Sequence, residues 1–237
     1  MKNAIIIMQR ELRSYFTSTI AYTVAAFFLF ICGYLFFSVL AATQEASLRY
    51  MLHNAAVTML LIAPALTMRL VAEERRSGTI ELLMTAPVTD TQVVIGKYLG
   101  SLVFFLSMLV LSLQYPIILM RLGSPEMGPM FTGFLGMFLL GAAFLAIGLV
   151  ASSLTKNQIV AAIGAFAVML LLWIVQWAAG PTATGWLPEV LRQLSVLGRF
   201  DNFVKGVVDT RDLVFFASLI GFCLFLSVRA LAAVKAR

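Results

Sequence analysis

The sequence predicts an all-α polytopic membrane protein with six transmembrane helices. Of its 237 residues, 61% are hydrophobic and only 12% are charged, whereas about 25% of the residues of a typical soluble domain carry a charge. The mean hydropathy is +0.97, and apolar runs near the ~20 residues that cross the hydrocarbon core recur along the chain. We therefore expect a single transmembrane domain over residues 1–237, without a soluble domain.

Residues 1–19 are predicted to form an N-terminal helix that lies in the membrane interface. Apolar side chains such as Ile5 and Leu12 are interspersed with charged ones such as Arg10, which is typical of an interfacial amphipathic helix. A signal peptide with Lys2 as its basic flank is the alternative. The apolar run that follows is too long for one, and no convincing cleavage site comes after it.

Six apolar segments are long enough to span the membrane. They are Ile20–Ala42, Met51–Ala72, Val93–Met120, Met130–Leu154, Gln158–Ala179 and Leu213–Ala232. Pro116 predicts a kink or break near the outer end of the third span, and Pro64 a smaller distortion in the second. The two cysteines, Cys32 and Cys223, both fall inside spans, which argues against a disulfide framework.

The distribution of basic residues predicts the orientation. With the N-terminus inside, the cytoplasmic segments hold eleven basic residues: Lys2, Arg10, Arg13, Arg69, Arg75, Arg76, Lys97, Lys156, Arg229, Lys235 and Arg237. The outer segments hold six: Arg49, Arg121, Arg192, Arg199, Lys205 and Arg211. The excess places both termini in the cytoplasm. It also explains the net charge of +6 without a nucleic-acid partner.

Residues 73–90 form the densest run of charge in the chain and are predicted to be a cytoplasmic elbow between spans two and three. Ser77 or Gly78 can cap the start of a short helix, and Glu81 in its first turn suits the helix dipole. Apolar side chains form one narrow stripe on this helix. The stripe consists of Ile80, Leu83 and Met84.

A second helix is predicted to follow the elbow at once. Pro87 stops the short helix after about two turns. Thr89 and Gln92 then have the spacing of a capping box, with Val88 and Val93 placed as its hydrophobic staple. The elbow is therefore expected to be joined rigidly to the third span.

Small residues predict close helix packing in spans three to five. Gly96 and Gly100 form a G-x-x-x-G pattern, and Gly148 and Ser152 are also four apart. Spacings of this kind let helix backbones approach closely in lipid. Packing within one bundle is the main interpretation, and a dimer face is the alternative.

Residues 180–212 are predicted to form two short helices that dip into the outer interface before span six. Phe200, Phe203, Val204 and Val207 would share one apolar face. Non-helical turns at that depth need shielding by protein or contact with water. The tryptophans are expected in the outer aromatic belt. They are Trp173, Trp177 and Trp186.

The residues predict no catalytic, cofactor or metal site. His53 is the single histidine and has no ligand-type neighbours at suitable spacing, so a structural polar contact is the expectation. Gly96-Lys97 lacks the upstream glycine and the Ser or Thr of a phosphate-binding loop. Gln114 and Gln176 are too weak a set for a proton relay. Energy for any uphill transport must therefore come from a partner, and the elbow is the natural contact point.

Residues 73–88 read Glu-Glu-Arg-Arg-Ser-Gly-Thr-Ile-Glu-Leu-Leu-Met-Thr-Ala-Pro-Val, and Gly96-Lys97 opens the following membrane helix. This pattern resembles the type-2 ABC transporter permeases, and most closely the gliding-motility-associated branch. The resemblance extends along the whole chain, from the interfacial helix to the Phe-Asp-Asn-Phe-Val-Lys-Gly-Val-Val-Asp segment before the last span. One departure is the short loop Thr43–Tyr50, which leaves no large outer domain for substrate capture.

The resemblance implies the membrane subunit of an ATP-driven exporter in the bacterial inner membrane. The elbow would be a coupling helix that docks on a separate ATPase subunit, which binds ATP and Mg while this chain binds no cofactor. The implied coupling residues are Glu73, Glu74, Arg75, Arg76, Ser77, Gly78, Thr79, Ile80, Glu81, Leu82, Leu83, Met84 and Pro87. The implied outer gate, from re-entrant helices, consists of Phe200, Asp201, Phe203, Lys205, Gly206 and Asp209.

The resemblance also implies further partners. A second permease chain, identical or different, would complete the pathway within the lipid bilayer, and an outer accessory protein would be a further partner.

Two alternative functions come from other classes of protein. A small intramembrane enzyme would depend on His53, and a membrane scaffold would bind a partner at the elbow without an ATP-driven cycle.

Overall fold

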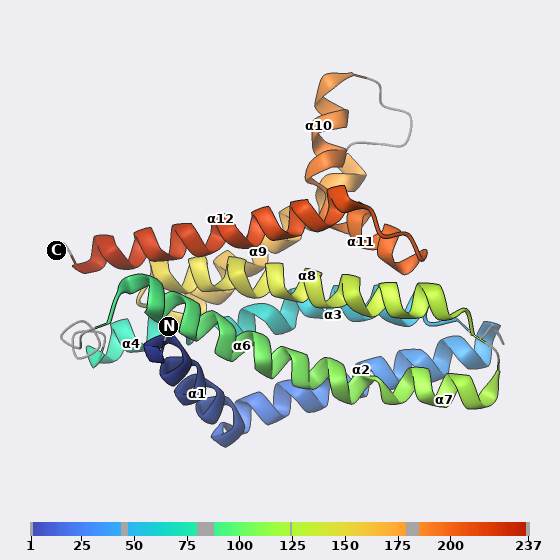
Figure 1. The fold of residues 1–237 in the computed structure, drawn as a ribbon, viewed down its shortest axis with the longest axis horizontal. Helices are drawn as coiled ribbons and strands as arrows, with labels where there is room; N and C mark the ends of the chain where they lie inside the picture. The colour runs from blue at the N-terminus through green and yellow to red at the C-terminus, as the bar shows by residue number, and fades with distance from the viewer. Residues whose placement is uncertain (1, 44–46, 80–87, 124, 179–184, 236–237) are drawn as a thin grey trace.

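The six expected spans form a helical bundle (Figure 1). The computed structural model describes residues 2–43, 47–79, 88–123, 125–178 and 185–235, and every regular element within these ranges is a helix. The spans consist of α2 (Thr19–Thr43), α3 (Arg49–Thr67) with α4 (Ala72–Ser77), α6 (Asp90–Ser112) with α7 (Gln114–Leu122), α8 (Met127–Leu154), α9 (Gln158–Ala178) and α12 (Thr210–Lys235). The prediction of six membrane-spanning helices is confirmed by length and composition.

Three shorter helices complete the described structure: α1 (Lys2–Thr17), α10 (Trp186–Leu194) and α11 (Val196–Val204). The N-terminus, α4 and the C-terminus lie toward one end of the bundle, while the α2–α3 and α7–α8 connections lie at the other (Figure 1). Six spans with both termini at one end match the predicted topology. Which end faces the cytoplasm stays a prediction from the charges.

The helix α8 forms the centre of the bundle and contacts α3, α6, α9, α11 and α12. Its glycines make the close approach possible. A Cβ added at Gly141 would overlap the ring of Phe105 on α6, and one at Gly148 would overlap the side chain of Thr67 on α3. These small residues therefore serve packing within the chain, whereas a Cβ at Gly164 on α9 would meet open space.

The third span is broken where the sequence predicts it. The helix α6 ends at Ser112, Leu113 forms a turn, and α7 begins at Gln114. Pro116 has no N–H, and its ring clashes with the carbonyl of the residue four positions earlier, Ser112. In the second span, α3 continues past Pro64 to Thr67, so the effect there is smaller.

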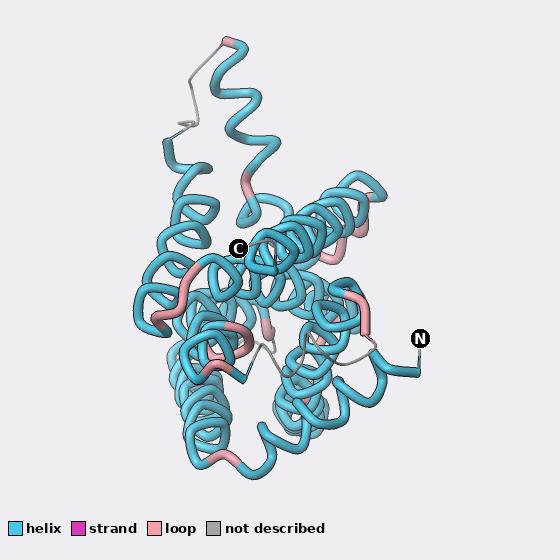
Figure 2. The backbone as a smooth tube through the Cα atoms, turned by 90° about the vertical axis from the view of Figure 1, so that its left-hand side faces the viewer, coloured by secondary structure: helices cyan, strands magenta, loops and turns pink. Residues whose placement is uncertain are grey.

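Two short helices, α10 and α11, precede span six, and they differ in their surroundings. Figures 1 and 2 show α10 projecting away from the bundle, whereas α11 packs against α3, α8 and α9. Val207 was expected on the buried face of α11, which is wrong: the helix ends at Val204 and Val207 is 54% exposed. The reason is Gly206, whose φ of 90° turns the chain out of the helix.

The structure shows the surroundings of two of the three tryptophans that were expected in the outer aromatic belt. Trp173 is buried in the core, where its ring centroid lies 6.0 Å from that of His53. Trp186 on α10 is largely exposed. The side chain of Trp177 lies outside the described part of the structure. Trp173 therefore packs against protein rather than lipid.

Candidate functional site

The charged start of the 73–90 elbow is itself helical. Ala72–Ser77 forms α4, with Glu73 and Glu74 in its first turn and Arg75 and Arg76 in its last, the arrangement that the helix dipole favours. Ser77 therefore lies within this helix, where its hydroxyl donates to the carbonyl of Glu73. The short helix that Ser77 or Gly78 was predicted to cap falls mainly on residues 80–87, outside the described part of the structure. Gly78 has a φ of 74° and ends α4.

The end of the elbow follows its prediction. Thr89 caps α6: its hydroxyl accepts from the backbone N–H of Gln92 at 3.3 Å, and the Gln92 side chain accepts from the Thr89 backbone N–H at 3.2 Å. Val93 is buried and Val88 packs against the core. Residues 80–87, with the expected coupling positions Ile80, Glu81, Leu82, Leu83, Met84 and Pro87, lie outside the described residues.

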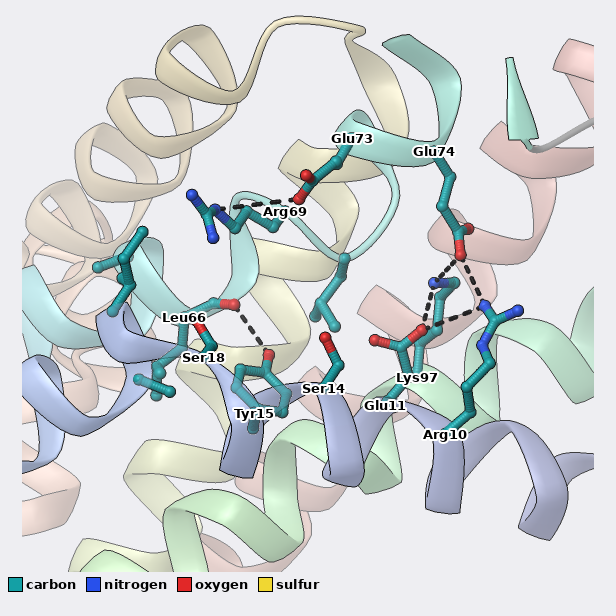
Figure 3. A pocket seen from close by; sticks show the side chains of 14 residues that line it. Arg10, Glu11, Ser14, Tyr15, Ser18, Leu66, Arg69, Glu73, Glu74 and Lys97 are labelled. Carbon is teal, nitrogen blue, oxygen red and sulfur yellow. Dashed lines mark hydrogen bonds and ion pairs between the residues drawn. The ribbon is translucent and has the colours of Figure 1, made fainter. Parts of the chain in front are cut away.

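A buried lysine ties this region to the rest of the molecule. The Nζ of Lys97 on α6 lies 2.8 Å from Oε1 of Glu11 on α1 and 2.9 Å from Oε1 of Glu74 on α4. The Lys97 side chain is only 1% exposed. Arg10 also contacts Oε1 of Glu74, at 2.8 Å (Figure 3). We call Arg10, Glu11, Glu74 and Lys97 the ion cluster. It joins three helices through charges that would be costly to leave unpaired.

The helix α1 lies directly on the G-x-x-x-G pattern of α6. A Cβ at Gly96 would come within 2.7 Å of the Cβ of Ile7, and one at Gly100 within 2.7 Å of the Cβ of Glu11. The ring of Tyr15 stacks on Phe104 with centroids 4.9 Å apart. The N-terminal helix therefore packs directly against the glycine pair of α6. This packing places Glu11 next to Lys97.

Tyr15 links α1 to the second span as well. Its hydroxyl donates to the carbonyl of Leu66 on α3 at 2.9 Å. Burial, followed by the nearby Glu11 carboxylate, raises the pKa of Tyr15 well above its usual value. The phenol therefore stays protonated and keeps donating this bond.

Two serines of α8 hold the turn between α3 and α4. The Oγ of Ser152 accepts from the backbone N–H groups of Val71 and Ala72 at 3.0 and 3.1 Å and donates to the carbonyl of Met68. It thus satisfies N–H groups at the start of α4 that have no partner within the helix. The carbonyl of Ser153 accepts from Arg75 at 2.6 Å.

The remaining described elbow residues are at the surface. Glu73 makes a loose ion pair with Arg69 at 3.9 Å, and Arg76 is exposed. The hydroxyl of Thr79 lies 2.9 Å from that of Ser77. Of the expected coupling residues, only Glu74 and Arg75 are thus built into the bundle by the described contacts.

The expected outer-gate residues divide into a buried and an exposed group. Phe200 and Phe203 are fully buried on the inner face of α11. A Cβ at Gly136 of α8 would overlap the Phe203 ring, and the Phe203 carbonyl accepts from Thr132 at 2.6 Å. These two phenylalanines therefore fix α11 to the centre of the bundle.

The polar outer-gate residues lie at the surface of α11 and of the turn that follows it. Asp201 lies 3.5 Å from Nδ1 of His53 and 3.6 Å from Nζ of Lys205. His53 is thus a polar contact between α3 and α11, as expected. Gly206 provides the left-handed turn, and Asp209 accepts from the backbone N–H of Arg211 at the start of α12.

A second buried charge was missed from the sequence. Asp212 on α12 is 3% exposed and accepts from Arg199 at 2.8 Å and from Asn202 at 2.9 Å. Arg199 also lies over the ring of Phe215, 4.2 Å from its centroid, and donates to the carbonyl of Gln193. These contacts join α10, α11 and α12.

Glu11 and Lys97 were also missed, although the sequence carries a signal for them. Ala4, Ile7 and Glu11 follow a helical spacing and share one face of α1. A carboxylate on that face and a lysine beside a glycine pair predict an ion pair once α1 is known to dock there. No partner within the chain was predicted for Lys97.

The chain matches the model of a known protein family. The family described as ABC-2 family transporter protein matches residues 40–194, from the end of α2 to the end of α10. A search of curated proteins found no match to the chain.

Proposed function

Because the chain belongs to the ABC-2 transporter family, we propose that it is the membrane-spanning permease subunit of an ATP-driven exporter, coupled through residues 73–90 to a separate ATPase. The family implies an ABC ATPase as partner and a multi-pass membrane location. Export, the bacterial inner membrane, and binding of ATP and Mg by the ATPase alone are parts of this proposal.

The observation that carries the proposal is the way α4 is tied into the bundle. Glu74 binds Lys97 of α6 and Arg10 of α1, while Arg75 binds the end of α8. A force applied to the elbow would therefore reach three helices at once rather than bend a free loop. Such a connection is what a subunit driven by a partner needs.

The proposed coupling contact lies in the short segment after α4. Leu83 and Met84 are two apolar side chains in a stretch too short to bury them alone, because an isolated two-turn helix is marginal in water. We assign them to a pocket on the ATPase. The exposed Arg76 sets orientation at its rim, where charges mainly tune association rates.

The test replaces one anchor at a time in the complex co-expressed with its ATPase. Leu83→Asp and Met84→Asp should abolish transport and reduce co-purification of the ATPase, because truncating a buried anchor commonly costs about 2 kcal/mol or more. The permease itself should still insert and elute as a single species. Transport and ATPase recovery are measured on the same preparations.

Two controls give the result its meaning. Arg76→Ala removes an exposed charge of the same elbow and should have a much smaller effect. His53 lies at the other end of the bundle from the elbow, so His53→Ala should leave transport largely intact. That result would also argue against an intramembrane enzyme that depends on His53. Full transport with bound ATPase in Met84→Asp would rule out this coupling site.

We further propose that two permease chains form the translocation pathway and that α11 acts as its outer gate. The chain has six candidate spans, which would supply half of a symmetric twelve-span pathway. The buried Phe200 and Phe203 would move with α8, and the α11–α12 turn at Gly206 would allow the gate to open.

A further inference from the structure

A cavity of about 440 Å³ lies where α1 meets the ends of α3, α4 and α6 (Figure 3). Its volume is within the roughly 300–1,000 Å³ of sites that bind small molecules. One wall carries ionisable side chains, including the ion cluster. The other is apolar and is formed by Ile20, Ala21, Ala65 and Leu66. A cavity with two such walls is suited to an amphiphile.

The charges of the polar wall are balanced but unevenly paired. Three cations, Arg10, Arg69 and Lys97, face three carboxylates, Glu11, Glu73 and Glu74. Within the ion cluster, Lys97 and Arg10 approach Glu74 to within 2.9 Å, so its charges are compensated. That leaves Arg69 and Glu73 as the loosely paired cation and anion.

Arg69 and Glu73 are available to a ligand. Their side chains are 40% and 53% exposed, and the 3.9 Å between Arg69 Nε and Glu73 Oε2 is too long for a hydrogen bond. In the described structure the buried Nε of Arg69 has no hydrogen-bond partner. One cation and one anion thus lie side by side with unused bonding capacity. The hydroxyls of Ser14 and Ser18 line the same cavity.

The apolar wall connects this polar pair to the membrane. Ile20 and Ala21 begin α2 directly after the turn at Ser18, and Ala65 and Leu66 end α3. Ile20 is 41% exposed, so a hydrocarbon chain can reach the cavity from the bilayer. Burial of each CH₂ group on such a wall contributes about 0.8 kcal/mol.

We propose that this cavity binds one zwitterionic aminophospholipid of the inner leaflet. The phosphate is held by the Arg69 guanidinium, whose planar fork matches phosphate oxygens, and by the serine hydroxyls. The ammonium group donates hydrogen bonds to Glu73, and one acyl chain lies along Ile20 and Leu66. The headgroup carries one charge of each sign, as the Arg69–Glu73 pair does.

Two related lipid headgroups fit the cavity less well because each lacks a group that the Arg69–Glu73 pair would bind. Phosphatidylglycerol has no cation to meet Glu73, and its net negative charge would unbalance a cavity whose three cations and three carboxylates compensate each other. Phosphatidylcholine has a cation, but its trimethylammonium group has no N–H donors. The proposal therefore predicts selectivity among lipids that share the same acyl chains.

The experiment is native mass spectrometry of the full chain, delipidated in detergent and then given equimolar phosphatidylethanolamine, phosphatidylcholine and phosphatidylglycerol. We expect one phosphatidylethanolamine to be retained with about tenfold higher occupancy than the other two, as a charge-assisted hydrogen bond supports. Free phosphoethanolamine, added in a separate arm, should not displace it at equal concentration. Displacement would assign the site to a soluble phosphate ester instead.

Variants test the assigned partners. Arg69→Gln should lower phosphatidylethanolamine retention about tenfold, and Arg69→Lys should fall between it and the wild type. Glu73→Gln should remove the discrimination against phosphatidylglycerol. Arg13→Gln is the matched control, because Arg13 is an exposed α1 residue that does not line the cavity.

The melting temperature of each variant is measured as a control, so that a variant that loses lipid because it is unfolded can be recognised. Equal retention of the three lipids by the wild type would overturn the proposal. Unchanged retention in a folded Arg69→Gln variant would do so as well.

Discussion

Lys97 carries a positive charge into the first turns of an apolar span and is almost fully buried there. A charge in this position is costly unless it is paired. The protein supplies two carboxylates, one from the N-terminal helix and one from α4. The stability of the junction therefore depends on a charge balance among residues far apart in the sequence.

Removing the cation should destabilise the protein more than removing an exposed one. Lys97→Met leaves the Glu11 and Glu74 carboxylates with the partly exposed Arg10 as their one cation in the ion cluster, and such loss of a buried partner commonly costs about 3 kcal/mol. Thermal unfolding in detergent should show a clear decrease in melting temperature. Lys156→Met, in the exposed α8–α9 turn, should behave like the wild type.

A combined variant separates charge imbalance from lost packing. Lys97→Met with Glu11→Gln and Glu74→Gln should regain part of the lost stability, because the two largely buried carboxylates are neutralised and the remaining cation, Arg10, is exposed to solvent. If Lys97→Met alone were as stable as the wild type, the ion cluster would have no structural role.

At the residue scale, local patterns were readable and long-range pairs were not. Phe200 and Phe203 were placed on one face by helical spacing, and both are buried. Glu11 and Lys97 are 86 positions apart, so their pairing depends on how two helices dock rather than on any local signal. The same holds for Asp212, whose partners come from another helix.

At the scale of helices, α1 can pack closely on α6 because Gly96 and Gly100 have no side chains. Gly96 and Gly100 leave a groove into which the backbone of α1 fits, and the aromatic contact at Tyr15 closes the far end. The N-terminal helix is thereby a packed part of the bundle. Its location in the membrane interface stays a prediction.

A side chain at the groove should loosen α1 without affecting the other spans. In Gly100→Val the added atoms collide with Glu11, and such overpacking typically costs about 1–3 kcal/mol. Hydrogen exchange of the backbone amides in Lys2–Thr17 should accelerate. Gly164→Val introduces the same residue at a helical glycine with open space around it and should leave α1 unchanged. Equal exchange rates in the two variants would contradict the docking role.

Helix ends were predictable wherever one chemical signal dominated. Thr89 and Gln92 form the predicted capping box, and Pro116 gives the predicted break. The helix at residues 72–77 was not predicted, because Ser77-Gly78 was interpreted as the start of a later helix and glycine serves at both ends of helices. Acidic residues before basic ones in residues 73–76 were the evidence that favoured a helix there.

For the whole molecule, the two ends of the bundle should differ in accessibility. Cysteines at Ser47 and Val208, in a background without Cys32 and Cys223, should react with an impermeant reagent on intact cells. Cysteines at Lys156 and Thr85 should react only after permeabilisation, because the basic residues concentrate at that end. The opposite pattern would reverse the orientation and place the elbow outside.

The active complex should contain two permease chains. Mass photometry of the complex purified with its ATPase, together with crosslinking, should report a permease stoichiometry of two. A single permease chain in a complex that transports would refute the proposed shared pathway. The six spans were evident from composition, whereas the arrangement of a second chain depends on surfaces that no local pattern specifies.

The docking of α1 on α6 has a consequence for biosynthesis. Glu11 leaves the ribosome long before its partner, because Lys97 follows 86 residues later. At about 5–20 residues per second, that interval is roughly 4–17 seconds. During this time the first helix has neither its glycine groove nor its lysine. The helix α1 is thus synthesised well before the residues that hold it, and its contacts with α6 form only once that helix has been made.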